Sequence, residues 1–324
     1  MNRTTDDLNK QLFFNHDVSD KVLCLFKSKQ FEQRTKEWYN ARKNCITASD
    51  ISSALKQTKN SCSSYMKLCP TFEINPKKQC AVYSSKQEFI HKKKFETSFS
   101  NKYTEWGQRF ERVASNIYAQ MNQTDVLELG LIIHPKYPFL AASPDGITPT
   151  GTLLEIKCPS TREIKKIPPL HYYHQMLMQM ECTGMKECDF FDARFNVYVD
   201  EQQWMTEARG WERENPNAKH HIYGLLLERQ DDRIFPPTRI IHISDFIKWC
   251  EEMNDDNEYN VVRYKLSEYN VCRIFEDKEW IEKNIQELKE TWQEILSPTT
   301  PPQPQPPRKR RKIKYDKIET SCLL

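Results

Sequence analysis

The sequence contains no long hydrophobic run and no secretory leader. Its apolar stretches are only a few residues long, whereas a helix needs roughly 20 apolar residues to cross a bilayer. Residues 1–10 are polar and charged, unlike the start of an exported chain. The 11 cysteines include no C-x-x-C pair, which argues against a disulfide framework. We therefore expect a soluble protein with free thiols, in a reducing intracellular compartment and without a membrane partner.

Several common functional signatures are also missing. The chain has no P-loop, no dinucleotide-binding glycine fingerprint and no Ser-His-Asp signature, so nothing points to those nucleotide-dependent or hydrolase classes. Cys62, Cys69, Cys80 and His91 come nearest to a zinc site, but gaps of six and ten residues between the cysteines fit structural zinc poorly. We expect no zinc.

Excess positive charge is confined to the end of the chain. The net charge is +3, and residues 297–324 alone contribute +5, so residues 1–296 carry −2. Nucleic acids select for locally clustered Lys and Arg. If the body binds nucleic acid, its positive surface must therefore be a local groove.

The order of elements predicts a mixed α/β fold. A chain of 324 residues with 38% apolar content is long enough for one large core or two small ones. Periodicity predicts helices at 34–43, 46–55, 103–121, 170–182, 245–253 and 277–295, and Thr47 and Asp50 form a capping-box pattern in the second of them. It predicts strands at 126–133, 139–142, 152–157, 188–199, 221–228 and 239–243, the first three as a meander.

The composition divides the chain into three parts. Residues 1–33 are expected to be a leader or first helix, and residues 34–296 the folded body. Residues 297–307 are a proline-rich linker that favours extended structure. A basic tail follows, with Arg308, Lys309, Arg310, Arg311, Lys312 and Lys314 close together. Two interpretations stay open, a plain disordered tail and a nuclear-import signal or DNA tether.

The strongest chemical signal is a Glu and a Lys two residues apart in an apolar strand. Alternation along a strand puts Glu155 and Lys157 of the segment 153–157 on the same face. Charges in a core strand cost several kcal/mol unless they are paired or bind metal. A purely structural ion pair is the alternative.

Two further carboxylates favour a metal site. Asp145 lies in a Pro-Asp-Gly turn ten residues before Glu155, where two adjacent strands would bring the carboxylates together, although an ordinary turn has the same sequence. Glu111, on the preceding helix, would project over the sheet; alone it is a surface residue. Mg²⁺ is held by one or two carboxylates with phosphate oxygens and water, and such ions drive phosphodiester hydrolysis. Lys157 would then orient the attacking water.

Four motifs in order carry a family resemblance. Residues 107–111, 143–146, 155–159 and 172–175 occur in the order found in lambda-exonuclease-like nucleases. Trp38, Arg42 and residues 46–49 extend the match upstream, and the helix with Trp280 and Trp292 extends it weakly downstream, so that it covers 34–296. The chain thus resembles the lambda-exonuclease-like and YqaJ-like viral recombinase family of PD-(D/E)XK nucleases, as found in large DNA viruses.

The resemblance implies a fold, an activity and a set of site residues. The fold is a PD-(D/E)XK restriction-endonuclease-like α/β core, with a central mixed sheet flanked by helices. The activity is metal-dependent removal of one strand of duplex DNA from a 5′ end, with two Mg²⁺ or Mn²⁺ ions. The implied catalytic residues are Glu111, Asp145, Glu155, Lys157 and Gln175; the metal ligands are Asp145, Glu155, the Ile156 carbonyl and Glu111; and the 5′-phosphate contacts are Arg42, Ser49 and Ser143.

One departure concerns the glutamine. The family often has alternating glutamines on the helix after the Lys strand, whereas here Gln175 is followed by apolar residues and then by Gln179. Which glutamine reaches the site stays open at this point. Met176, Met178 and Met180 in the same segment are more typical of core packing than of substrate contact.

The resemblance also implies partners. These are DNA with free duplex ends, a single-strand annealing protein and further copies of the chain in a ring-shaped trimer. The expected location is the host cytoplasm, in a viral factory, or the nucleus if the basic tail is an import signal. Two rival functions remain: a structure-specific or nicking endonuclease of the same fold, and a non-catalytic protein that binds DNA or host factors.

Overall fold

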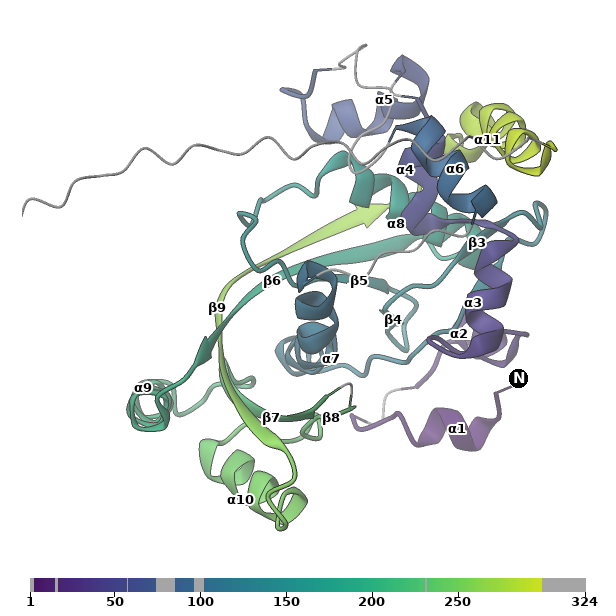
Figure 1. Ribbon diagram of the computed structural model, residues 1–324. Helices are drawn as coiled ribbons and strands as arrows, with labels where there is room; N and C mark the ends of the chain where they lie inside the picture. The colour runs from purple at the N-terminus through teal and green to yellow at the C-terminus, as the bar shows by residue number, and fades with distance from the viewer. Residues whose placement is uncertain are drawn as a thin grey trace, which may run out of the picture.

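A curved mixed sheet forms the centre of the molecule. The computed structural model describes residues 3–14, 17–56, 58–73, 85–95, 102–230 and 232–298. Within them the sheet has the order β4-β5-β6-β9-β7-β8. These strands are β4 (Gly146–Ile147), β5 (Leu153–Lys157), β6 (Glu187–Tyr198), β9 (Asn260–Phe275), β7 (Tyr223–Arg229) and β8 (Asp232–Ile234). Within this sheet, among the described residues, only β5 and β6 pair in parallel. The long strands β6 and β9 bend together into an arc (Figure 1).

A second, smaller sheet corrects the predicted meander. It has the order β1-β3-β2, from β1 (Ile46–Thr47), β3 (Leu140–Ala142) and β2 (Ile132–Ile133). The predicted strand at 126–133 is reduced to β2 and two isolated bridges, one between Leu127 and Ile147 and one between Leu131 and Phe31. The meander prediction was therefore wrong, because the chain leaves the small sheet after Ala142 and enters the large one at Gly146. The turn that carries Asp145 connects the two sheets.

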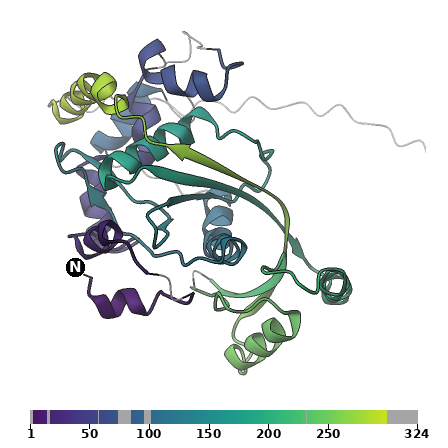
Figure 2. The ribbon, with the colours of Figure 1, turned by 180° about the vertical axis from the view of Figure 1, so that it is seen from behind.

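Two long helices lie on opposite faces of the large sheet. Helix α7 (Lys102–Asn122) lies in the hollow of the arc (Figures 1 and 2), where Phe110 and Ile117 are fully buried. Helix α8 (Leu170–Thr183) packs on the other face and ends at Gly184, whose φ of 67° suits a residue without Cβ. Its methionines are buried in the main core, which confirms their expected packing role.

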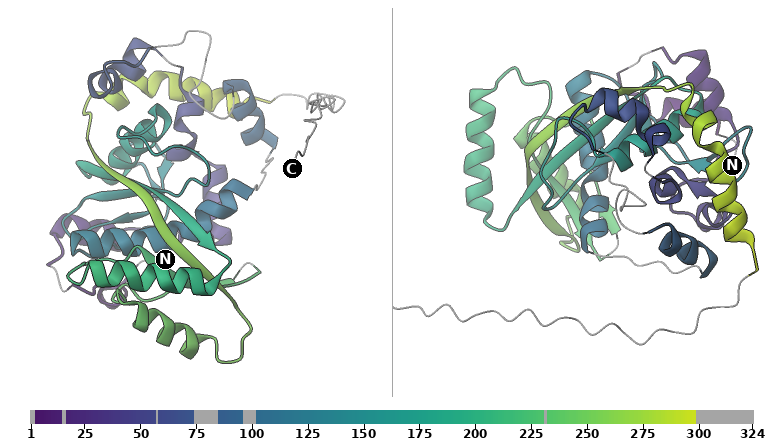
Figure 3. Two further views of the ribbon diagram at one scale, coloured as in Figure 1. Left: turned by 90° about the vertical axis from the view of Figure 1, so that its left-hand side faces the viewer. Right: turned by 90° about the horizontal axis from the view of Figure 1, so that it is seen from above.

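Further helices cover the ends of the sheet. Above α8 lie α4 (Ile51–Ala54), α5 (Lys59–Leu68), α6 (Lys86–Phe95) and α11 (Trp280–Leu296). Helices α9 (Glu201–Glu214) and α10 (Ile243–Met253) pack against the outer side of β7 through Trp204 and Phe246 (Figure 3). The predicted helix at 46–55 is a short 3-10 turn followed by α4, and the capping box of Thr47 and Asp50 is confirmed.

The described leader residues pack onto the body. They form α1 (Thr5–Asn9) and α2 (Asp20–Lys27), and α3 (Lys36–Lys43) follows. Val22 and Phe26 are fully buried in the main core. The backbone N–H groups of Phe13 and Phe14 donate to the Asp125 carboxylate. These residues therefore contribute to the core of the body.

The C-terminal half differs from the expectation in four elements. The 16-residue strand β9, the short strand β8 and the helix α9 were not predicted. The predicted strand at 239–243 was wrong: the Ile240 N–H donates to the Pro237 carbonyl in a turn, and Ile243 begins α10. Pro236 and Pro237 directly before this segment favour a turn. The strand that pairs with β6 is β9.

The last described residue is 298. Residues 299–324, with the end of the proline-rich linker and the basic tail, lie outside the described residues. Across the described ranges, no helix combines the length and the apolar character that a bilayer crossing requires.

Gly224 tests how tightly β7 packs on β9. A Cβ at this position would overlap the hydroxyl and ring of Tyr264, which is fully buried and bonded to His221 Nε2 at 3.0 Å. We expect Gly224→Ala to lower the free energy of unfolding by about 1–3 kcal/mol through overpacking.

The matched control is Gly210→Ala in α9, where an added Cβ meets nothing within 4 Å. It should raise the free energy of unfolding by about 0.5–1 kcal/mol, because alanine favours helix. Urea denaturation measures both, and equal effects of the two changes would contradict the packing described.

Candidate active site

Strand β5 carries a buried ion pair. The Glu155 side chain is 0% exposed, and its Oε1 pairs with Nζ of Lys157, which is 25% exposed. The contact places both side chains on the same face of the strand, as the alternation predicted. An unpaired charge at this depth would cost several kcal/mol, so each residue stabilises the other's burial.

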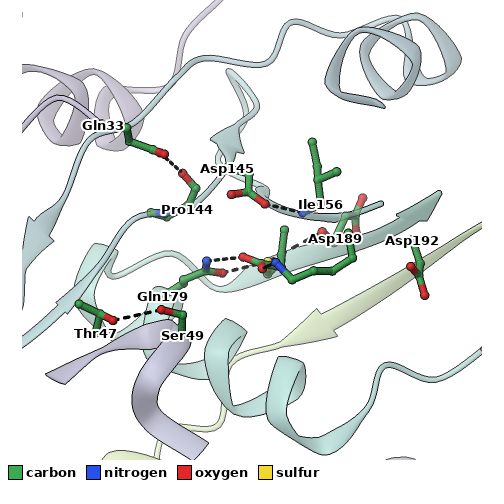
Figure 4. A network of polar contacts seen from close by, with 12 residues as sticks. Gln33, Thr47, Ser49, Pro144, Asp145, Ile156, Gln179, Asp189 and Asp192 are labelled. Atoms are coloured by element: carbon green, nitrogen blue, oxygen red, sulfur yellow. Dashed lines mark hydrogen bonds and ion pairs between the residues drawn. The ribbon is translucent and has the colours of Figure 1, made fainter. Parts of the chain in front are cut away.

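Asp145 lies directly across from this pair. The antiparallel register matches Gly146 with Leu154, so one step further it matches Asp145 with Glu155. The Asp145 N–H donates to the Leu154 carbonyl at 3.1 Å, and the Ile156 N–H donates to Asp145 Oδ2 at 2.6 Å. Figure 4 shows Asp145 beside Ile156. The two predicted carboxylates therefore lie on neighbouring strands.

The backbone of Ile156 faces the same side. In a β-strand the N–H and C=O of one residue point toward the same edge, and the Ile156 N–H points toward Asp145. Pairing of β4 with β5 ends at Leu154, so the Ile156 carbonyl lies beyond the last paired residue. This carbonyl is available to a ligand beside Asp145.

Gln179, rather than the predicted Gln175, contacts the acidic pair. Gln179 is fully buried on α8, and its Nε2 donates to Glu155 Oε2 at 2.6 Å. Gln175 lies about one helical turn earlier and is half-buried. The catalytic role of Gln175 stays a prediction, while Gln179 is the glutamine of α8 whose side chain contacts Glu155.

Glu111 enters from the opposite face. It lies on α7, and its Oε1 accepts from Arg34 Nη2 at 3.1 Å. A cavity of about 320 Å³ is lined by Glu111, Asp145 and Ile156 together with Arg34 and other residues. The third predicted carboxylate therefore shares a cavity with the end of β5.

The carboxylates are crowded enough to shift their pKa values. Burial raises the pKa of Asp145 well above its usual range, and the neighbouring Glu155 raises it further. Burial also raises the pKa of Glu111, against the lowering effect of Arg34 and Lys157. Burial alone would lower the pKa of Lys157, but Glu155 and Asp145 outweigh it and the net shift is upward. Lys157 is therefore a cation stabilised by Glu155 and Asp145, and the Asp145 carboxyl ionises less readily than a free one.

This donor set suits a hard divalent cation. Within the described residues, no three His, Cys, Asp or Glu side chains are grouped closely enough to hold a metal by themselves. Mg²⁺, however, is commonly held by one or two carboxylates with phosphate oxygens and water. Asp145, Glu155 and the Ile156 carbonyl supply oxygen donors. Burial, and then repulsion from Glu155, raise the pKa of Asp145, and a bound cation would offset both effects.

The predicted phosphate contacts form a neighbouring group. Arg42 Nη2 donates to Ser49 Oγ at 3.4 Å, and the guanidinium lies 4.3 Å from the Trp38 ring centroid. Trp38 Nε1 donates to Ser143 Oγ at 3.0 Å. Arg42, Ser49 and Ser143 are therefore brought together through Trp38, and we call these four residues the end pocket.

Sequence reasoning missed several contacts of this region. Gln33 Nε2 donates to the Pro144 carbonyl at 3.1 Å and ties residues 30–34 to the Asp145 turn. Arg34, with a φ of 67°, reaches Glu111. Lys93 of α6 contacts Asp50. No local sequence pattern marks these residues, because each acts on a partner more than 40 positions away.

One family model matches part of the chain. Residues 37–186 match the model of the YqaJ-like viral recombinase domain, which confirms the resemblance that the ordered motifs indicated. An uncharacterized protein of Acanthamoeba polyphaga mimivirus is 26% identical over 312 residues, which is 82% of this chain and 53% of that protein. The chain thus spans about half the length of the curated relative it matches.

Two solved structures are similar in overall outline. An alkaline exonuclease from Laribacter hongkongensis is 22% identical, covers 81% of this chain and 92% of its own, and has a TM-score of 0.43. A phage-related exonuclease from Haemophilus somnus is 11% identical, with 78% and 93% covered and the same TM-score. Such loose correspondences carry no functional conclusion on their own.

Asp145→Asn should stabilise the metal-free protein. Because the folded state raises the pKa of Asp145, wild-type stability falls as the pH rises from the unfolded pKa of about 4 through the higher folded value. The variant lacks this penalty and keeps an acceptor for the Ile156 N–H. We expect a gain of about 0.5–2 kcal/mol in the free energy of unfolding, measured by urea denaturation in chelator at neutral pH.

The gain should vanish in acid, where the wild-type carboxyl is protonated in both states, and shrink when Mg²⁺ is added. A variant that is less stable than the wild type at neutral pH would contradict the crowding of acids at this site.

Gln179 and Gln175 form a matched pair of variants on one helix. Gln179→Ala removes the donor to Glu155, so we expect the affinity for Mn²⁺ to fall by about 10- to 100-fold, as for other residues that orient metal ligands. Gln175→Ala should stay within about twofold of wild type. Titration calorimetry with Mn²⁺ measures both, and the reverse order would favour Gln175 as the site residue.

Proposed function

From the YqaJ-like match over residues 37–186, we propose that this protein is a metal-dependent exonuclease that hydrolyses one strand of duplex DNA from its 5′ end. The observation that carries the proposal is the meeting of Asp145, Glu155 and Lys157 at the end of β5. Glu111 lines the same cavity as Asp145. A purely structural ion pair would explain Glu155 and Lys157, but would leave the raised pKa of Asp145 as an uncompensated cost.

The residues divide the chemistry between them. Asp145, Glu155 and the Ile156 carbonyl are the proposed ligands, with Glu111 as a further acid at the cavity. Divalent cations bound there would polarise the phosphoryl group and lower the pKa of the attacking water. Lys157 would orient that water and offset the negative charge that develops on the phosphate. Gln179 holds the Glu155 carboxylate in place.

The end pocket supports a preference for 5′ ends. A guanidinium with hydroxyl groups beside it binds phosphate well, and Arg42, Ser49 and Ser143 provide these groups. Ser143 lies two residues before Asp145, so a terminal phosphate in the pocket would set the distance to the bond that is cut. An enzyme built this way exposes a 3′ single strand for recombination or repair.

The wider setting of this function is also a proposal. We assign the nuclease to residues 34–296, preceded by the leader and followed by the linker and basic tail. A single-strand annealing protein and a ring-shaped trimer are the partners that the family resemblance implies. The host cytoplasm, or the nucleus if the tail is an import signal, is the proposed location.

The decisive assay compares a linear duplex carrying a 5′ phosphate with a covalently closed circle, in Mg²⁺, in Mn²⁺ and in chelator. We expect loss of the linear substrate only, and only with metal. Lys157→Ala should lower the rate by about 100-fold or more. Because this change leaves Glu155 unpaired in the interior, Asp145→Asn serves as a second inactive variant that is expected to remain folded.

The other outcomes each favour a different function. Cutting of the circle would make the protein an endonuclease of the same fold. No cleavage of either substrate with any of the ions would favour a non-catalytic protein that binds DNA or host factors.

A further inference from the structure

Lys93 lies beneath the end pocket, outside every motif discussed so far. Its Nζ pairs with Asp50 Oδ2 at 3.0 Å, and the two side chains are only 14% and 20% exposed. The same ammonium donates to the carbonyls of Arg42 at 3.0 Å and of Cys45 at 2.8 Å. A lysine has three N–H donors, and all three are used.

These contacts hold the carboxyl end of α3. Helix α3 ends at Lys43, so the Arg42 carbonyl lies in the last turn, where a helix favours a cation, and the Cys45 carbonyl lies just beyond the helix end. Lys93 supplies that cation from α6, 50 positions along the chain. The backbone that carries Arg42 is thereby fixed to α6.

Asp50 is the nearest competitor for Arg42. Its charge acts on Arg42, since Asp50 raises the pKa of that guanidinium against the larger lowering effect of burial. Its Oδ2, however, is already occupied by Lys93 and by the Thr47 hydroxyl, at 2.7 Å. Arg42 instead contacts Ser49 and the Trp38 ring. The three charges together leave one net positive charge at the pocket.

We propose that Lys93 is a positioning residue for the end pocket: it neutralises Asp50 and anchors α3, so that Arg42 remains available to a 5′-terminal phosphate. Without Lys93, Asp50 would turn to Arg42 and cancel its charge. The inference rests on the proposed function, because it assigns a role within the same end pocket.

The test measures end preference without cleavage. Dissociation constants of two otherwise identical duplexes, one with a 5′ phosphate and one with a 5′ hydroxyl, are measured by fluorescence anisotropy in Ca²⁺. The ratio of the two constants is the end preference. We expect Arg42→Ala to abolish it, and Lys93→Met to reduce it by about fivefold, the size of a single partly exposed charge interaction.

A double variant separates charge from folding. In Lys93→Met combined with Asp50→Asn, Arg42 again has no competing carboxylate, so the end preference should return to within about twofold of wild type. Lys92→Met removes the same charge from an exposed position on α6 and should change nothing. Thermal unfolding of each variant accompanies the binding data.

Each outcome decides the proposal. An unchanged preference in Lys93→Met, or an equal loss in the single and double variants, would overturn the role of Lys93 while leaving the nuclease proposal intact. If the wild type itself shows no end preference, the end pocket and the role of Lys93 fall together, and the assay with linear and circular DNA still decides whether the protein is a nuclease.

Discussion

The carboxylate of Glu155 lies at the centre of the molecule with no solvent around it, and the rest of the site depends on how it is held there. Lys157 neutralises one oxygen and Gln179 donates to the other. Both contacts require that β5 be buried between α7 and α8, since Gln179 comes from α8. The sheet and its two covering helices therefore allow β5 to carry the charges of Glu155 and Lys157 in the core.

The turn at residues 143–145 joins the two halves of the proposed site. Ser143 belongs to the end pocket through Trp38, and Asp145 belongs to the acidic site through Ile156. The same turn carries the chain from the small sheet to the large one. A terminal phosphate and a reacting phosphate would thus be positioned by one short rigid segment, with Gln33 fixing it from the leader side.

Periodicity predicted the elements that are locally encoded. Helices α7 and α8 and strands β5 and β6 appear close to their expected bounds, because each has a continuous local signal: α7 is amphipathic, and β5, β6 and α8 are apolar segments buried along most of their length. It failed where pairing partners are distant: β9 binds β6 across more than 60 intervening residues. Its half-exposed face gives a weak alternation that sequence alone does not distinguish from loop. The segment 239–243 has strand-like composition but forms a turn that leads into α10.

The local sequence is enough to give the chemical content of the site: the spacing of Glu155 and Lys157 puts them on one face, and the Pro-Asp-Gly turn brings Asp145 opposite. The residues that support them follow from the packing of distant elements. Gln179 contacts Glu155 because α8 turns that face toward β5, and Lys93 reaches the end pocket because α6 lies against α4 and α3. Such choices depend on the angles between elements, which no local pattern encodes.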